Sequence, residues 1–132
     1  FEGAKRCIDN AESLGVNRFI LMSANGVSKN GTSYQITKYK AEVYLRNNIR
    51  NWTIIRPSLI FGDAKGKKEF CIELKKNMLS LPFPAPAFFP GINIFSAGKF
   101  KMSPIHVTNV AEIIVRSINN NHAFKKIYEL GM

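Results

Sequence analysis

Thr32-Ser-Tyr-Gln-Ile-Thr-Lys-Tyr-Lys-Ala-Glu-Val-Tyr-Leu-Arg46 is the stretch that decides the fold, because it predicts one amphipathic helix that ends near residue 48. Thr32 or Ser33 can begin this helix, since a side-chain oxygen at that position accepts a hydrogen bond from a free backbone N–H group. At 100° per residue, the phenol of Tyr34 and the ammonium group of Lys38 fall on one face, one turn apart.

Strand and helix patterns alternate on both sides of this helix. A helical pattern ends at Gly15, and apolar runs at 18–22 and 52–55 predict strands. The first run is continuous, which is typical of a strand buried on both faces. A further helix is predicted over 67–79. This alternation with short links predicts an α/β protein built from parallel βαβ units.

The last part of the chain predicts one more helix and one more strand. Thr108 is the expected cap of the helix, and Ile127 begins the expected strand, which ends at residue 130. The helix has an apolar side formed by Val107, Val110, Ala111, Ile114, Val115 and Ile118.

Composition describes an ordinary globular domain. The chain has 132 residues, is 45% hydrophobic and begins with Phe1 inside a helical pattern, so we expect a piece of a longer protein. No apolar run approaches the roughly 18 residues of a membrane span. Cys7 and Cys71 stand at helical core spacings and predict neither a disulfide framework nor a metal site, which favours a reducing cytoplasm.

The formal net charge of +10 raises the question of an anionic partner. Nucleic-acid binding would need the basic residues gathered into a stripe, whereas here they are spread along the chain. We therefore favour a solvated basic surface, then a phosphate-bearing ligand or anionic partner, and nucleic acid least.

Residues 80–101 interrupt the alternation with a segment rich in proline and phenylalanine. Loops of this length are usually functional in compact domains. Three interpretations stay open: an irregular apolar cover over the core, a wall of a substrate pocket, or a patch that faces a partner or a membrane.

Tyr34 and Lys38 can act as an acid–base pair. A lysine ammonium one turn away favours the ionised form of a phenol, and so does a bound, positively charged nicotinamide. The same ammonium can donate a hydrogen bond to a ribose hydroxyl and hold a cofactor beside the phenol. The spacing alone also occurs by chance, so the alternative is an ordinary helix surface.

Four motifs then occur in order along the chain: Tyr34-Gln-Ile-Thr-Lys38-x-x-Ala41-Glu42, Trp52-Thr-Ile-Ile-Arg-Pro-Ser-Leu-Ile-Phe-Gly62, Pro104-Ile-His-Val-x-x-Val-Ala111 and Tyr128-Glu-Leu-Gly131. In these motifs the chain resembles the extended and atypical short-chain dehydrogenase/reductases of the NAD(P)-dependent epimerase/dehydratase type. Within them it most resembles the branch related to the nucleotide-binding accessory subunit of respiratory complex I. The resemblance implies one partial NAD(P)-binding domain over residues 1–132: the C-terminal part of a Rossmann-like, doubly wound parallel sheet with the start of a small substrate-binding lobe at 80–101.

The resemblance also implies roles for individual residues. Tyr34 would be the general acid/base, and Lys38 would be its partner and the ribose anchor for NAD or NADP. Ser23, Pro57 and Ser58 would line the nicotinamide side of the cofactor. The same comparison favours a role for His106 in fixing the turn before the last helix, over proton transfer.

Two departures from the family leave two functions open. The glycine-rich phosphate loop of the family does not occur in this chain, and Ala24 stands where its enzymes carry a serine. One function is an NAD(P)-dependent oxidoreductase or epimerase acting on a carbonyl or hydroxyl group of a small molecule, in the cytoplasm. The other is a non-catalytic accessory or assembly subunit of complex I type, within a membrane-associated complex at the inner membrane.

Overall fold

The computed structural model describes residues 1–62, 76 and 103–131. In these ranges the chain forms, in order, α1 (Glu2–Ser13), β1 (Arg18–Met22), α2 (Ser33–Asn48), β2 (Asn51–Pro57), β3 (Ile60–Phe61), β4 (Ile105–His106), α4 (Val107–Ile118), the short 3-10 helix η2 (Asn121–Ala123) and β5 (Lys126–Leu130). None of the described helices has the length and apolar character needed to cross a membrane. The helix predicted at 67–79, Cys71 and the segment 80–101 lie outside the described residues.

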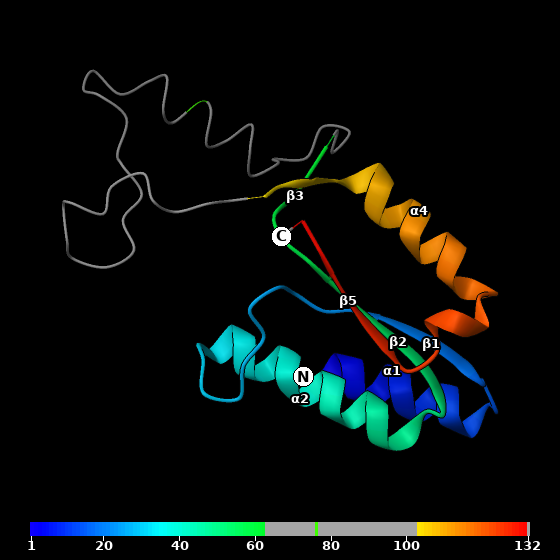
Figure 1. The fold of residues 1–132 in the computed structure, drawn as a ribbon. Helices are drawn as coiled ribbons and strands as arrows, with labels where there is room; N and C mark the ends of the chain where they lie inside the picture. The colour runs from blue at the N-terminus through cyan, green and yellow to red at the C-terminus, as the bar shows by residue number, and fades with distance from the viewer. Residues whose placement is uncertain (63–75, 77–102, 132) are drawn as a thin grey trace.

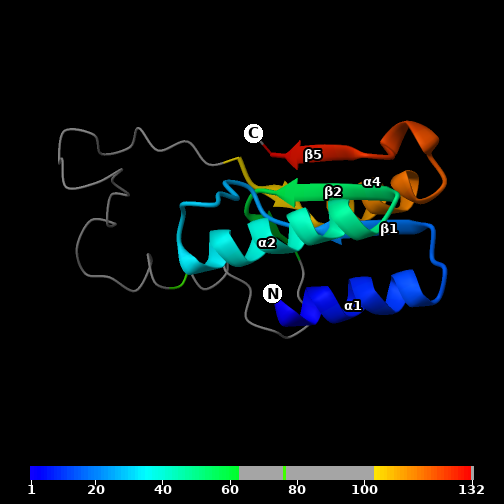
Figure 2. The ribbon, with the colours of Figure 1, turned by 90° about the horizontal axis from the view of Figure 1, so that it is seen from below.

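A parallel sheet forms the centre of the fold, with its strands in the order β1-β2-β5 (Figure 2). Ile54 in β2 pairs with Leu21 of β1 on one side and with Ile127 of β5 on the other. β3 and β4 form a separate parallel pair through Ile60 and Ile105. The predicted α/β class with a parallel sheet is therefore confirmed.

Helices cover both faces of this sheet, α1 and α2 on one side and α4 on the other (Figure 1). Side chains alternate between the two faces along β2, so Ile54 points to α1 and α2 while its neighbour Ile55 points the other way. Both are fully buried. The core beneath α1 and α2 consists of Ile8, Leu45, Ile49 and Ile54, surrounded by Ala11, Phe19, Leu21, Tyr44 and Trp52.

Two predictions about buried residues were wrong. β1 is only partly buried, and its last residue, Met22, is 50% exposed. β1 stands at the edge of the described three-stranded sheet, so it has a neighbouring strand on one side only. Cys7 is exposed as well, because α1 packs through Ile8 and Ala11.

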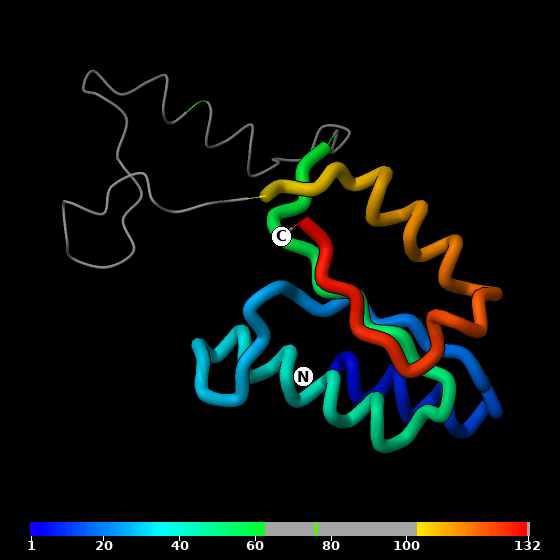
Figure 3. The backbone as a smooth tube through the Cα atoms, viewed as in Figure 1, coloured from blue at the N-terminus to red at the C-terminus, as the bar shows by residue number. Residues whose placement is uncertain are grey.

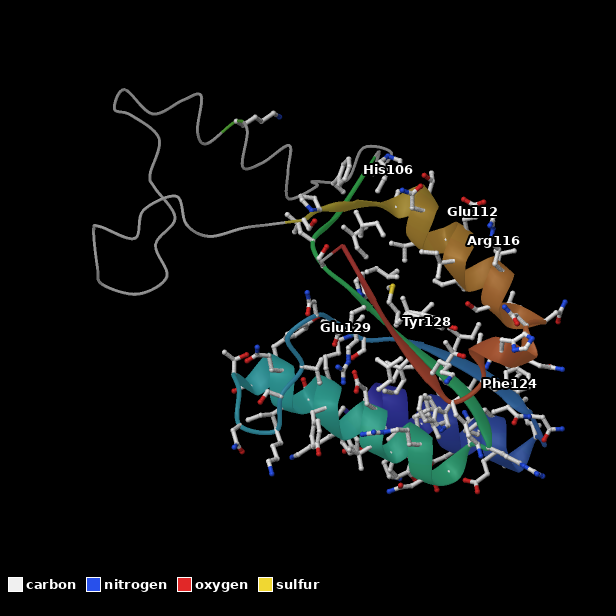
Figure 4. The ribbon with its side chains drawn as sticks, in the orientation of Figure 1. His106, Glu112, Arg116, Phe124, Tyr128 and Glu129 are labelled. Atoms are coloured by element: carbon white, nitrogen blue, oxygen red, sulfur yellow. The ribbon has the colours of Figure 1, made fainter. Side chains whose placement is uncertain are left out.

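The start of α4 also differs from the prediction. Its cap is His106 and not Thr108, because the helix begins two residues earlier than expected, at Val107. The ring nitrogen Nδ1 of His106 accepts a hydrogen bond from the backbone N–H of Thr108 at 3.3 Å (Figure 4). The expectation that His106 fixes this turn is thus confirmed.

The buried side of α4 is rotated from the predicted apolar side. Val110 and Ser117 are buried, whereas Val107, Val115 and Ile118 are exposed by 42%, 65% and 46%. The contacts of α4 with β1 and β2 set this orientation, which the apolar pattern alone cannot provide.

Arg18 ties the start of β1 to the end of α4. Its guanidinium group donates hydrogen bonds to the carbonyl oxygens of Ser117 at 2.6 Å and Ile118 at 3.3 Å, and it lies 4.4 Å from the centroid of the Phe124 ring. Carbonyl groups at a helix end carry partial negative charge, so a cation there is favourable. Burial lowers the pKa of Arg18 from its ordinary value, but a guanidinium group stays charged in proteins.

Asp9 links α1 to α2 through a hydrogen bond from Tyr44 and is also paired with Lys5 on its own helix. Its carboxylate accepts one from the Tyr44 hydroxyl at 2.5 Å and one from the Lys5 ammonium at 2.9 Å. The hydrogen bond from Tyr44 is the main reason that the pKa of Asp9 is lowered from 3.8, followed by the one from Lys5. The same contact raises the pKa of the Tyr44 phenol above 10.0.

These shifts predict an acid-dependent loss of stability. The pKa of Asp9 is lower in the folded state than in the unfolded state. Its contribution to the free energy of unfolding is therefore complete at a pH above the unfolded-state pKa, and it is lost as the pH falls through the folded-state pKa. We expect Asp9→Asn to lower the denaturant midpoint at neutral pH, and the difference from wild type to shrink at a pH below 3.8. Chemical denaturation of both proteins at the two pH values measures this.

The control for Asp9→Asn is Glu12→Gln on the same helix. Glu12 is exposed and forms no ion pair within the described residues. Its substitution should change the midpoint little at either pH. If the effect of Asp9→Asn were the same at both pH values, the contact with Tyr44 and Lys5 would not act through the charge of Asp9.

Candidate functional site

The carboxyl ends of the three parallel strands meet at one end of the sheet, beside the first turn of α2 (Figure 3). Backbone hydrogen bonds continue past the strands and hold the following residues together. The N–H of Ser23 donates to Ile55 O at 2.7 Å, that of Asn25 to Pro57 O at 2.9 Å, and that of Ser58 to Leu130 O at 2.9 Å. Ligands of open parallel sheets bind at this edge.

The start of helix α2, which lies at this edge, is fixed by a capping box. The Thr32 hydroxyl accepts a hydrogen bond from the N–H of Gln35, and the Gln35 side chain accepts one from the N–H of Thr32 at 2.8 Å. Such a capping box satisfies two of the free N–H groups at a helix start. The first two turns of α2 are thereby held in place, with their positive dipole end toward the strand ends.

Tyr34 and Lys38 lie on these two turns, and the structure brings them together. The Lys38 ammonium is 5.6 Å from the centroid of the Tyr34 ring, within the range of a cation–π contact. Tyr34 is 59% exposed, so its hydroxyl is accessible to a ligand. In the described residues, neither side chain is hydrogen-bonded to Ser23, Pro57 or Ser58. The catalytic role of the pair stays a prediction.

Ser23 uses its hydroxyl inside the protein. The side chain is 5% exposed, and its Oγ donates a hydrogen bond to Oε1 of Glu42 at 2.6 Å. The N–H group of Ser23 also donates a hydrogen bond, to the carbonyl oxygen of Ile55. Ser23, which was predicted to line the nicotinamide, therefore has no free hydrogen-bond donor. Ala24, which follows it, is half-buried and brings no hydroxyl to this edge.

The acceptor of that bond, Glu42, is the centre of a charged network that the sequence did not reveal. Glu42 is fully buried on α2, and its two oxygens accept hydrogen bonds from Nε and from a terminal nitrogen of Arg56 at 2.9 and 2.7 Å. Another nitrogen of Arg56 donates to Glu129 on β5 at 3.0 Å. The hydrogen bond with Glu42 is the main cause that raises the pKa of Arg56, and desolvation opposes it.

This network joins α2 to the carboxyl ends of three strands. Ser23 follows β1, Arg56 lies near the end of β2 and Glu129 lies near the end of β5. The sequence did contain a signal for this network. Glu42 is one turn beyond Lys38 on the same side of the helix, and Arg56 lies on the same face of β2 as Trp52 and Ile54, which face α1 and α2. The network positions the helix that carries Tyr34 and Lys38, and it runs from the fully buried Glu42 to the exposed Glu129.

Pro57 and Ser58 lie where β2 ends. Pro57 is buried and pairs with Leu130, and the Ser58 hydroxyl donates to the carbonyl oxygen of Ser103. Gly131 follows β5 with a φ of +74°, and an added Cβ there would collide with Ser58 and Ser103. Glycine is therefore required at 131, both for its backbone conformation and for the close approach. The contacts of Pro57 and Ser58 with a cofactor stay a prediction.

Comparison with known proteins agrees with the α/β fold. The model of a family described as NAD(P)H-binding matches residues 1–78. No protein of curated function matches the chain. The expected position in the C-terminal part of the fold finds no support in the family match, which contains β1, α2 and β2.

Three solved structures are similar in fold. A Bacillus halodurans protein described as an NAD-dependent epimerase/dehydratase has a TM-score of 0.64 and 22% identity over 100% of this chain and 54% of its own. The Bordetella bronchiseptica enzyme WbmH, in complex with NAD+, has a TM-score of 0.64 and 16% identity over 97% of this chain and 43% of its own. UDP-glucose 4-epimerase of Thermus thermophilus, in complex with NAD, has a TM-score of 0.66 and 17% identity over 98% and 47%. The chain thus has a Rossmann-like fold and spans about half the length of these structures.

Proposed function

Because the chain belongs to the NAD(P)H-binding family, we propose that the strand ends and the start of α2 form one wall of a dinucleotide site at which Tyr34 and Lys38 perform acid–base chemistry. The substrate class would be a carbonyl or hydroxyl compound. The observation that carries the proposal is the position of the Lys38 ammonium, 5.6 Å from the Tyr34 ring at this edge.

The residues at this edge supply some of the groups that would bind an anionic dinucleotide. The start of α2 offers the positive end of a helix dipole, and Lys38 offers a cation with three donors. A phosphate-binding glycine loop would have to come from outside this chain, whose 132 residues hold none. The cofactor, when bound, supplies hydride transfer.

The proposed division of work follows from exposure. The Tyr34 hydroxyl, on an exposed side chain, would donate or accept the substrate proton, and Lys38 would favour the ionised phenol and hold a ribose hydroxyl. Pro57 and Ser58 would border the nicotinamide. Ser23 would contribute through its backbone, since its hydroxyl is donated to Glu42. We also propose that residues 1–132 are one partial domain, with 80–101 in the substrate lobe.

One observation favours a second candidate function. The hydroxyl of Ser23 is turned into the protein and Ala24 has none, so the pair faces this edge without a serine hydroxyl from the end of β1. A protein that binds NAD(P)H without turnover, as an accessory or assembly subunit of complex I type, fits this arrangement. The intact protein would then bind the cofactor but convert no carbonyl or nucleotide-sugar substrate.

Substitution of Lys38 tests the cofactor site for either function. A hydrogen bond to a charged group contributes about 1.5–3 kcal/mol, so Lys38→Ala should weaken NAD(P)H binding by roughly 10- to 100-fold. Titration of the intact protein, followed by the fluorescence of the reduced nicotinamide or by calorimetry, measures the affinity.

The matched control is Lys40→Ala, on the same helix. Lys40 is exposed and lies about 160° around the helix axis from Lys38, so its substitution removes the same charge from a different side of the helix. The affinity of the Lys40→Ala variant for NAD(P)H should remain close to that of the wild-type protein. Equal affinities for the two variants would contradict the role of Lys38 as a ribose anchor.

A further inference from the structure

The loop between β1 and α2 contains two Asn-Gly pairs, Asn25-Gly26 and Asn30-Gly31. In such a pair the side-chain amide of asparagine can react with the backbone nitrogen of the next residue, because glycine has no side chain to shield that nitrogen. The two pairs are the same dipeptide with different flanking residues, so a difference between them that appears only in the folded protein arises from structure.

The two pairs differ in their hydrogen bonds in the structure. The Gly26 N–H donates a hydrogen bond to Oδ1 of Asn25 at 2.7 Å, which places the reacting nitrogen against the side-chain amide. Both residues are exposed, so water reaches them. Within the described residues, no hydrogen bond joins the Asn30 side chain to the N–H of Gly31.

Contacts on both sides keep the first pair in this arrangement. The N–H of Asn25 donates to Pro57 O at 2.9 Å, and Nε2 of Gln35 donates to Gly26 O at 2.8 Å. Gly26 has a φ of +73°, which glycine adopts without strain. The end of β2 therefore holds the N–H of Asn25, and the first turn of α2 holds the carbonyl group of Gly26.

We propose that Asn25 is a site of spontaneous modification, at which the folded protein forms a succinimide with Gly26 and then hydrolyses it. A base removes the Gly26 amide proton, and the nitrogen forms a bond to Cγ of Asn25. The bond from Cγ to Nδ2 breaks, and Nδ2 leaves as ammonia after taking up a proton. Water then opens the ring at either carbonyl group, which produces aspartate or isoaspartate at position 25. No oxidant or reductant takes part.

The product changes the edge of the sheet in two ways. A carboxylate replaces a neutral amide two residues beyond Ser23, and the isoaspartate form adds one carbon to the backbone. The added carbon lies between the two anchored groups, the N–H of Asn25 and the carbonyl of Gly26. The chemistry itself does not depend on the proposed cofactor site.

Incubation in water enriched in the heavy oxygen isotope tests the proposal, because hydrolysis of the succinimide leaves a label at the modified residue. Wild-type protein is incubated folded at mildly alkaline pH, and also in denaturant, and peptides that contain each pair are compared by mass. We expect the label to appear faster at position 25 than at position 30 in the folded protein, and at similar rates in denaturant. Asn25→Gln should lose most of the label, whereas Asn30→Gln should keep it.

Two results would overturn the proposal. One is a similar rate at the two positions in the folded protein. The other is a preference for position 25 that persists unchanged in denaturant, since it would then come from the local sequence and not from the folded loop.

Discussion

Glu42→Ala is expected to lower the free energy of unfolding by about 3 kcal/mol, the low end of the range for breaking a buried ion pair. The substitution leaves the guanidinium of Arg56, only 18% exposed, without the partner that accepts two of its hydrogen bonds. It also leaves the buried Ser23 hydroxyl without its acceptor. The remaining contact of Arg56 with Glu129 reduces the loss, which is why the low end applies.

Chemical denaturation of two further variants shows whether the charge or the hydrogen bonds carry this effect. Glu42→Gln retains an acceptor for Ser23 and for Arg56, so we expect a smaller loss, about 1–2 kcal/mol. Glu112→Ala removes an exposed carboxylate that is paired with Arg116 at 2.6 Å on the outer side of α4 (Figure 4). Exposed pairs contribute less than about 1 kcal/mol. If Glu42→Ala were as mild as Glu112→Ala, the network would not hold α2 against the strands.

Tyr34→Phe is expected to reduce turnover by about 10²- to 10⁴-fold, the usual contribution of a general acid or base. Phenylalanine keeps the ring beside the Lys38 ammonium and removes only the hydroxyl, so the affinity for NAD(P)H should change little. The rate of NAD(P)H oxidation with a panel of carbonyl substrates, together with a binding titration, separates the two quantities in the intact protein.

Tyr39→Phe is the matched control for the hydroxyl. Tyr39 lies on the same helix, about 140° around its axis from Tyr34, so its hydroxyl faces a different direction. Turnover should be unaffected. A Tyr34→Phe variant with wild-type turnover would exclude the acid–base role. A wild-type protein that binds NAD(P)H without turning over any substrate would favour the accessory function.

Local patterns predicted the elements well where neighbours in the chain decide them. The predicted start of α2 agrees with the observed one because the Thr32–Gln35 capping box is a contact within one turn. The strand near residue 52 agrees within two residues at each end, β2 running from Asn51 to Pro57. Pro57 still belongs to the strand, since the residue that follows it supplies the hydrogen bond to Leu130.

Sequence patterns predicted burial less well where contacts between distant segments determine which residues are buried. The side on which α4 is buried depends on where the helix is seated against β1 and β2, and Arg18 reaches its end from 99 residues away. The exposure of Met22 depends on the place of β1 in the strand order. Neither the helical period nor the apolar run at 18–22 contains that information.

The candidate site divides in the same way. The sequence by itself determined that Tyr34 and Lys38 lie together, because residues four apart on an α-helix share a face whatever surrounds them. Only the tertiary structure decided that Ser23 turns its hydroxyl to Glu42 and that Arg56 joins Glu42 to Glu129. Those partners are 14 to 73 residues apart, and they meet because β5 pairs with β2 and α2 packs on one face of the sheet (Figure 1). A buried charge needs its partners wherever the fold places them, and that placement is a property of the strand order.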